Sequence, residues 1–304
     1  MSLVAKCITR IREKGVSFSM DLSGVTESVR KDTLTSLVEF VDVTKIECEQ
    51  TYASYHKVEA IAPCVVDGVD YVACGGYSDE IKLWGIGNDE DHFSLGFNGD
   101  RDDVYSLVSY HRNGKTWLAV GCENGYIMIW NVSSKRFLLT LSEHTSDVCA
   151  LQIYDKHGKM YLISGCRNGD LGIWDLDSYD LVKKVDCGIS GISQVCALDV
   201  VSNDGTDHLI VVSSKGIEIW CLDKYAKVAE LDKNVNYLSV AVTSYKGMLM
   251  VAGGTFDGQV KVWNLDNHQL VGEYTPCEGC GVWVLGWIIS KKKICLVSGG
   301  GILL

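Results

Sequence analysis

Five tryptophans follow short apolar runs at a nearly constant interval, and this spacing constrains the fold more than any other feature of the chain. They are Trp84, Trp130, Trp174, Trp220 and Trp263, which lie 46, 44, 46 and 43 residues apart. Self-similarity at a fixed period indicates a repeat architecture, and a period of about 40–45 residues suits a four-stranded sheet. We therefore expect one sheet per repeat, with the tryptophan near the end of its third strand.

Each repeat has the same internal order, which is clearest in the third. Residues 144–185 read HTSDVCALQIYD, KHG, KMYLISGC, RNG, DLGIWDL, DSYD and LVKKV, so short turn sequences separate four apolar or alternating runs. Runs of this length predict strands joined by hairpins. Asn or Asp before Gly125, Gly169 and Gly258 supplies the positive φ angles that two-residue hairpins require. Small pairs such as Ser164–Gly165 and Gly253–Gly254 predict close packing against the next sheet.

The chain resembles WD-repeat proteins over about residues 45–304. The residues that carry the resemblance are His144 ahead of Val148, Ser164, Trp174 and Asp175, with Trp-Asn at Trp130 and Trp263 in place of Trp-Asp. The resemblance implies an all-β fold, the WD-repeat β-propeller, in which each repeat forms one blade. Asn124 and Asn168 stand where the family has a turn aspartate, which survives as Asp257. The resemblance therefore also implies that the family's buried His–Asp–Ser–Trp hydrogen-bond network is incomplete here.

The last repeat ends early, because residues 301–304 align with the third strand of the fourth repeat. The missing outer strand is predicted at residues 45–52, KIECEQTY. WD-repeat rings often close by letting the N-terminus complete the last blade, and closure removes a bare sheet edge. This interpretation gives six blades over residues 43–304, with seven as the alternative if residues 1–42 form a degenerate repeat.

Residues 1–42 are predicted to be an appended N-terminal arm. Its first part, CITRIREKGVSFSMDL, is consistent with a hairpin. The stretch that follows, residues 26–43, has apolar residues at roughly helical spacing. These residues are Val29, Leu34, Leu37, Val38 and Val41. We expect an amphipathic helix here that packs on its own domain.

Charge and cysteine content narrow the class of partner and the compartment. The formal net charge of −11 argues against nucleic acid, because phosphate contacts need a basic face. It favours other proteins as partners, basic peptides among them. Several of the thirteen cysteines lie in apolar runs, as Cys149, Cys196 and Cys295 do, so we expect free thiols in a cytoplasmic protein, with the nucleus as the alternative. The sequence has no apolar run of about 18 residues, so we expect no membrane span.

No motif predicts catalysis or a bound cofactor. The sequence lacks GxSxG, HExxH and phosphate-loop patterns. Cys277 and Cys280 form a single CxxC pair, but a structural zinc site needs four ligands, so we expect an ordinary turn and no metal. His56 and His144 precede first strands, where the family has a structural histidine. A non-enzyme is therefore expected, with an enzyme on a propeller scaffold as the minor alternative.

We expect an intracellular protein-interaction scaffold that binds partner peptides or loops at one mouth of the propeller, within a larger complex. The turns between second and third strands and the links between blades gather there, and rigid strands hold their side chains ready for a partner. The candidate residues in the turns are Tyr77, Glu123, Arg167 and Phe256. Those in the links are Asp103, Asp147, Gln194 and Tyr237. An alternative is an adaptor that docks substrate or cargo proteins through residues 1–42.

Overall fold

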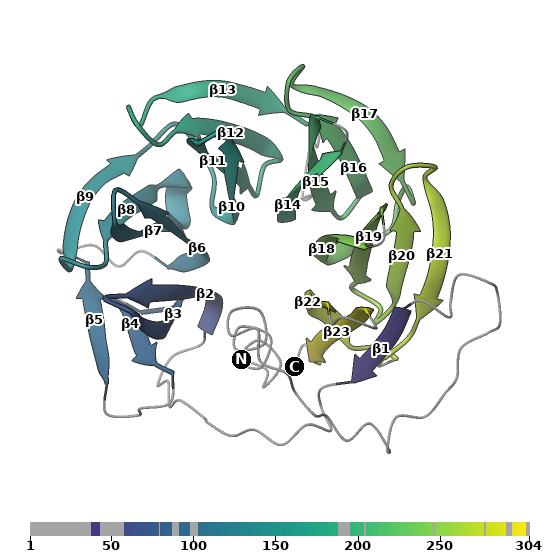
Figure 1. Ribbon diagram of the computed structural model, residues 1–304, viewed down its shortest axis with the longest axis horizontal. Coiled ribbons are helices and arrows are strands. Elements are labelled where there is room, and N and C mark those ends of the chain that lie inside the picture. The colour runs from purple at the N-terminus through teal and green to yellow at the C-terminus, as the bar shows by residue number, and fades with distance from the viewer. Residues whose placement is uncertain are drawn as a thin grey trace. The chain divides into compact units, whose positions relative to one another are not determined.

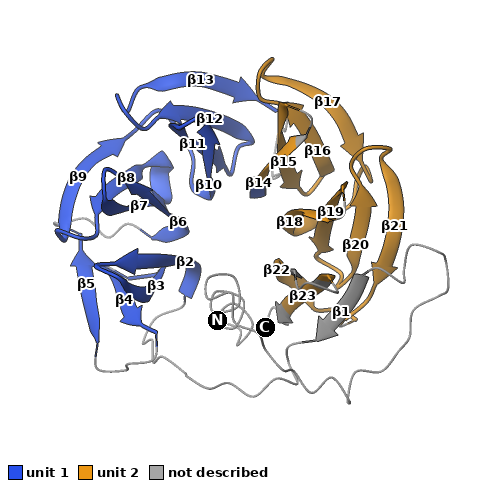
Figure 2. Cartoon of the chain, viewed as in Figure 1, with its two compact units in different colours: residues 1, 49–198 blue, residues 2–48, 199–304 orange. Residues whose placement is uncertain are grey.

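The computed structural model describes residues 38–42, 58–78, 80–86, 91–97, 103–187, 195–203, 205–245, 247–276, 278–289 and 294–301. Across these ranges the chain is almost entirely strand, with one 3-10 turn at Glu123–Gly125 and no α-helix. The all-β prediction is confirmed. The chain divides into two compact units: residues 49–198 with Met1, and residues 2–48 with residues 199–304 (Figure 2).

The first unit contains three four-stranded antiparallel sheets, each made of strands in consecutive order (Figure 1). The first sheet is β2 (Val58–Val66), β3 (Val69–Gly76), β4 (Glu80–Gly85) and β5 (His92–Gly96). The second is β6 (Val104–Arg112), β7 (Lys115–Cys122), β8 (Ile127–Asn131) and β9 (Arg136–Leu141). The third is β10 (Val148–Lys156), β11 (Lys159–Cys166), β12 (Asp170–Asp175) and β13 (Leu181–Asp186).

The second unit continues the same plan. Its first sheet begins with β14 (Val195–Asn203), which crosses from the first unit, and continues with β15 (Thr206–Ser213), β16 (Gly216–Cys221) and β17 (Ala226–Leu231). The next is β18 (Tyr237–Tyr245), β19 (Met248–Thr255), β20 (Val260–Asn264) and β21 (Gln269–Tyr274). A three-stranded sheet follows, in the order β1 (Val38–Asp42), β23 (Ile294–Gly301) and β22 (Gly281–Ile289). As the spacing predicted, the periodic tryptophans lie on the third strands, β4, β8, β12, β16 and β20.

An N-terminal strand does pair with the last sheet, but it lies at residues 38–42 and is the third strand of a three-stranded sheet. β1 runs parallel to β23, from Val38 opposite Ile294 to Asp42 opposite Ser298. The predicted helix over residues 26–43 is therefore wrong at these five positions. The sequence there, VEFVD, also alternates and is rich in valine, and the edge of β23 supplies the backbone partners that a strand needs. Residues 26–37 and the predicted closing strand at residues 45–52 lie outside the described residues, and six blades remains a prediction.

The turns differ from the prediction in where the two-residue hairpins lie. Gly125, Gly169 and Gly258 have positive φ angles as expected, between 86° and 95°. Two consecutive positive φ angles occur instead in the first turns of the first unit's three sheets, at Asp67–Gly68, Asn113–Gly114 and His157–Gly158. Type I′ hairpins need both angles positive, so these first turns are the tight ones.

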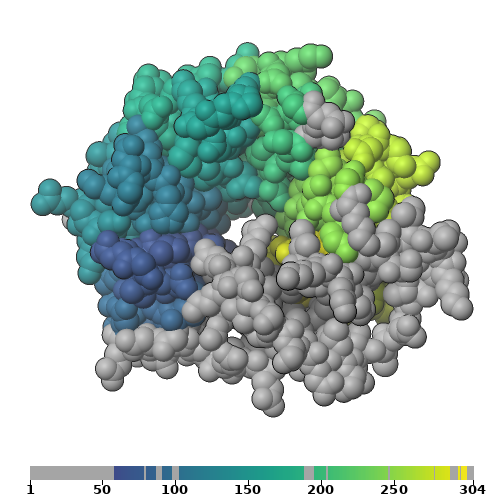
Figure 3. Space-filling view, viewed as in Figure 1, coloured from purple at the N-terminus to yellow at the C-terminus, as the bar shows by residue number. Residues whose placement is uncertain are grey.

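Glycine near the end of the second strands β3, β7, β11 and β19 lets neighbouring sheets approach closely. A Cβ added at Gly75 would lie 2.5 Å from Cγ1 of Val104, and one at Gly165 would lie 2.5 Å from Cγ1 of Val195. Since real Cβ atoms do not approach other atoms this closely, these positions require glycine. The predicted close packing is confirmed, because in the first unit buried side chains of adjoining sheets form common core clusters. Figure 3 shows the atoms of the blue and teal segments in contact at the surface.

The outer strands β9, β13, β17 and β21 share a β-bulge. Trp130 pairs with Phe137 and Ile129 pairs with Leu139, which leaves Leu138 without an opposite residue. Val182, Val228 and Val271 occupy the corresponding positions in β13, β17 and β21. Leu138, Val182 and Val228 are 44%, 46% and 53% exposed. The bulge therefore places an apolar side chain in solvent at the same point of successive sheets.

Candidate protein-binding site

One edge of each sheet carries both kinds of predicted binding residue. The turn between second and third strands and the start of the first strand lie at this edge, because the strands alternate in direction. The backbone N–H of Arg167 donates to the carbonyl of Asp147 at 2.9 Å, and that of Glu123 donates to the carbonyl of Asp103 at 3.0 Å. In the first unit, turn residue and link residue are therefore held side by side.

Four side chains from the three sheets of the first unit form a continuous group, which we name the Tyr–Arg cluster: Tyr77, Tyr105, Asp147 and Arg167. Nε of Arg167 lies 2.8 Å from Oδ2 of Asp147. Its guanidinium carbon lies 5.5 Å from the ring centre of Tyr105, a cation–π distance. The ring of Tyr105 meets that of Tyr77 edge to face, with centres 6.5 Å apart. The cluster thus connects three successive sheets.

Tyr105 and Arg167 keep their usual charge states around neutral pH. Burial raises the pKa of Tyr105 to about 12, with a further contribution from Asp147. Burial also raises the pKa of the neighbouring Cys149 thiol to about 12, although Arg167 acts in the opposite direction. Burial opposes a rise in the pKa of Arg167, but Cys149, Asp147 and Tyr105 outweigh it. A protonated thiol is a poor nucleophile, so the arrangement suits recognition better than proton transfer or covalent chemistry.

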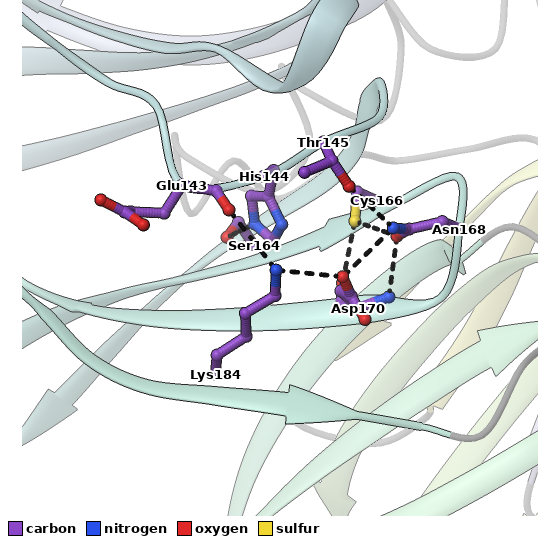
Figure 4. A network of polar contacts seen from close by, with 8 residues as sticks. All are labelled: Glu143, His144, Thr145, Ser164, Cys166, Asn168, Asp170 and Lys184. Carbon is purple, nitrogen blue, oxygen red and sulfur yellow. Dashed lines mark hydrogen bonds and ion pairs between the residues drawn. The ribbon is translucent and has the colours of Figure 1, made fainter.

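A polar network fixes the turn that carries Arg167 (Figure 4). Sγ of Cys166 donates to Oδ1 of Asn168 at 2.7 Å, and the backbone N–H of Asp170 donates to the same oxygen at 3.1 Å. Nδ2 of Asn168 donates to Oγ1 of Thr145 at 3.3 Å. Arg167 lies between two of these residues in the chain. Its backbone is therefore set by contacts on both sides.

The same sheet holds the predicted histidine–serine–tryptophan contacts. Nε2 of His144 lies 2.6 Å from Oγ of Ser164, which also accepts from Nε1 of Trp174 at 2.8 Å. His144 is 5% exposed, and its Nδ1 has no hydrogen-bond partner within the part of the chain that the structure describes. The turn residue, Asn168, bonds elsewhere. The network is therefore incomplete, as predicted.

In other sheets the indole N–H of the third-strand tryptophan has a different hydrogen-bond acceptor, or none among the described residues. Nε1 of Trp220 donates to Oε2 of Glu218 at 2.9 Å, and Oε1 of Glu218 lies 3.0 Å from Nζ of Lys227. Nε1 of Trp130 is buried without an acceptor among the described residues, between the rings of Phe97 and Phe137. A buried acidic side chain thus replaces the His–Ser pair in one sheet and nothing replaces it in another.

Of the remaining predicted site residues, one is exposed, one lies outside the described residues and one is buried. Phe256 is 47% exposed in a turn of the second unit, where its N–H donates to the carbonyl of Asn236 at 2.9 Å. Gln194 lies outside the described residues. Tyr237 is fully buried, and its hydroxyl donates to Oδ2 of Asp232 at 2.7 Å. Its prediction as a partner-binding residue is wrong, because the ring packs over Gly253 and inside its own sheet.

Sequence reasoning missed two aromatic residues at this edge. Tyr105 and Trp283 lie near the starts of β6 and β22, where a register shift skips each of them in the pairing with the next strand. Trp283 is 43% exposed. Each follows a valine near the start of a first strand, Val104 and Val282. An alternating pattern assigns that position to one face of the sheet, whereas the bulge redirects it.

Several further expectations concern metals, cysteines and membranes. No group of His, Cys, Asp or Glu suited to a metal ion occurs within the described ranges. Cys149 and Cys196 are free thiols, whereas Cys280, for which an ordinary turn was predicted, is disulfide-bonded. Cys277 and His56 lie outside the described residues. None of the helices in the described part of the chain could cross a membrane.

Comparison with known proteins places the repeat in a family. Residues 93–131 and 135–175 match the model of the WD domain, G-beta repeat. The chain is 25% identical over 246 residues to apoptotic protease-activating factor 1 of Rattus norvegicus, and the match covers 79% of this chain and 19% of that protein. The crystal structure of the computationally designed Ika8 protein resembles it with a TM-score of 0.59 at 20% identity, over 82% of this chain and 69% of that one. With two repeats that match the WD domain model, repeated four-stranded sheets and third-strand tryptophans, the chain resembles WD-repeat proteins and has the fold class of their β-propellers.

Proposed function

We propose that this chain is a protein-interaction scaffold that binds an extended partner segment across the turns of its first unit. The observation that carries the proposal is the Tyr–Arg cluster, which connects three successive sheets through exposed side chains. Tyr77 is 41% exposed, and the side chain of Arg167 is 48% exposed. Tyrosine and arginine are the residue types most enriched among those that dominate binding energies. WD-repeat domains generally mediate protein–protein interactions, which supports the same conclusion.

Preorganisation strengthens the proposal. Arg167 is held by the carboxylate of Asp147 and by the ring of Tyr105, and its backbone by the neighbouring network. Oδ1 of Asp147 also accepts from the backbone N–H of Asn124 in the adjoining sheet, at 3.3 Å. A side chain that is already ordered loses less rotamer entropy when a partner binds. Binding energy is then retained as affinity.

Site-specific photo-crosslinking in native cells tests the proposed face. A benzophenone side chain replaces Tyr126, which is 40% exposed directly after the Glu123–Gly125 turn. The matched control replaces Tyr225, which is 37% exposed at the opposite edge of its sheet. We expect discrete protein adducts from the first position and none of these from the second. Identical adducts from both positions, or none from position 126, would contradict the proposal.

A paired substitution asks whether the cluster supplies the binding energy. Tyr77→Ala with Arg167→Ala should abolish the adducts formed at position 126. The folded state should be little affected, because the Arg167–Asp147 pair is half exposed and such pairs contribute about 0–1 kcal/mol. Circular dichroism and thermal unfolding provide the control. Full adduct yield from a folded double variant would show that the cluster is not the binding surface.

A further inference from the structure

The second and third sheets of the first unit offer the same site with opposite charge at one position. Arg167 and Glu123 hold equivalent places, since each donates its backbone N–H to the carbonyl of the link residue of its own sheet, Asp147 and Asp103. The link residue is aspartate in both sheets. In the third sheet the aspartate faces a guanidinium, whereas in the second it faces another carboxylate.

The third sheet shows how this position binds a cation. Arg167 donates to Asp147 at 2.8 Å and lies over the ring of Tyr105 at 5.5 Å. These contacts combine a charge-assisted hydrogen bond with an aromatic face, an arrangement that suits a planar guanidinium better than an ammonium. The sheet thus contains an arginine site already filled by its own side chain.

The second sheet has the carboxylates of Asp103 and Glu123 at these two positions, with no arginine at the turn position. Neither Asp103 nor Glu123 forms an ion pair with any side chain that the structure describes. Asp103 is near enough to Tyr105 to contribute to the rise in the pKa of that phenol. The edge-to-face contact with Tyr105 places the half-exposed ring of Tyr77 beside it. Since Arg167 and Asp147 neutralise each other, the two carboxylates leave this part of the surface negative.

We infer that the partner segment supplies an arginine side chain, which the carboxylates of Asp103 and Glu123 bind beside the rings of Tyr77 and Tyr105. This inference rests on the proposed function and adds the chemistry of the partner. From outside the chain, the arginine would make the kind of carboxylate contact that Arg167 makes with Asp147 within it. Charge complementarity supports the choice, because like charges held together favour a counter-charge from a partner.

The sharpest test replaces Glu123 by arginine, the residue that holds the equivalent position in the third sheet. Glu123→Arg should pair with Asp103 as Arg167 pairs with Asp147, and so fill the site. Glu123→Gln removes the charge without filling the site, and Asp103→Asn removes the other carboxylate. Asp155→Asn with Asp180→Asn is the control for net charge, since both carboxylates are exposed at the opposite edge of the third sheet. Thermal unfolding shows that each variant is folded.

The probe is a fluorescent, end-blocked peptide in which arginine alternates with glycine and serine, compared with its citrulline and glutamate counterparts by anisotropy. We expect the arginine peptide to bind the wild-type chain about tenfold more tightly than the citrulline peptide. Glu123→Gln and Asp103→Asn should each weaken it about tenfold, Glu123→Arg more, and the control pair less than about twofold. Equal binding of the arginine and citrulline peptides, or equal effects of the control and the site variants, would overturn the inference.

Crosslinking from position 126 separates this inference from the proposed function. If the wild-type chain gives no adducts, the proposed function fails. If adducts persist in Glu123→Arg at the wild-type yield, the face binds a partner but not through an arginine at these carboxylates. Loss of adducts in Glu123→Arg, with retention in the Asp155→Asn and Asp180→Asn pair, supports both.

Discussion

Gly75 offers a direct measure of how closely neighbouring sheets pack. In Gly75→Ala the new Cβ would lie 2.5 Å from Cγ1 and 2.9 Å from Cβ of Val104, which is fully buried at the start of the next sheet. Neither residue can move far, because both are part of paired strands. Overpacking of this kind costs about 1–3 kcal/mol in the free energy of unfolding. We expect a loss near the upper end of that range.

A second substitution tests whether this contact is the cause. Val104→Ala removes the atom at 2.5 Å and by itself should cost about 2 kcal/mol in lost burial and cavity. Combined with Gly75→Ala it should cost less than the sum of the two single changes by about 1 kcal/mol or more. The contacts at 2.9 Å with Cβ of Val104 and at 3.4 Å with Cδ1 of Leu107 then remain, and a small shift relieves them.

Urea unfolding followed by circular dichroism provides the measurement. Gly96→Ala is the matched control, since it lies in the same sheet and a Cβ there meets nothing within 4 Å. It should leave stability unchanged or raise it by about 0.4–1 kcal/mol. If Gly75→Ala is as stable as Gly96→Ala, or if its effect simply adds to that of Val104→Ala, the explanation by close packing is refuted.

Three further predictions concern buried polar groups. Glu218→Ala should lower stability by about 1–3 kcal/mol because the indole N–H of Trp220 loses its acceptor, whereas Glu218→Gln keeps an acceptor and should lose less in the same urea assay. Burial lowers the pKa of His144 to about 4 from 6.5, so between these values the unfolded chain binds the extra proton and the free energy of unfolding falls as the pH falls. The difference in stability between wild type and His144→Asn should therefore narrow from about pH 6.5 to about pH 4. A constant difference over that range would count against the assignment. Tyr237→Phe should cost about 1 kcal/mol through loss of the bond to Asp232 while leaving adduct formation at position 126 unchanged.

The repeat itself could be predicted because it depends on local chemistry. Alternating runs, turn glycines and third-strand tryptophans each encode a strand or hairpin without reference to distant residues. The closing strand could not be placed in the same way. Residues 38–42 fit both a helical and an alternating pattern, and the partner that decides between them, β23, is more than two hundred residues away in the chain. Tertiary pairing overrides a weak local preference there.

Individual site residues were harder to predict than the edge that carries them. Tyr77 and Arg167 are exposed as expected, because turns between strands face solvent. Tyr237 occupies a link position like that of a first-strand valine, and its hydroxyl finds an acceptor in Asp232, so it is buried. Tyr105 was missed because a β-bulge, which no residue pattern announces, turns it toward the cluster.

The bulges of the outer strands bear on how this protein avoids self-assembly. A regular strand edge with exposed apolar residues is a template on which another chain can extend the sheet. In β9, β13 and β17 the register breaks at Leu138, Val182 and Val228, apolar residues that are exposed to solvent. An incoming strand could match the backbone on one side of the break but not on both. Fibril-like growth from these edges is thereby interrupted where apolar attraction would otherwise promote it.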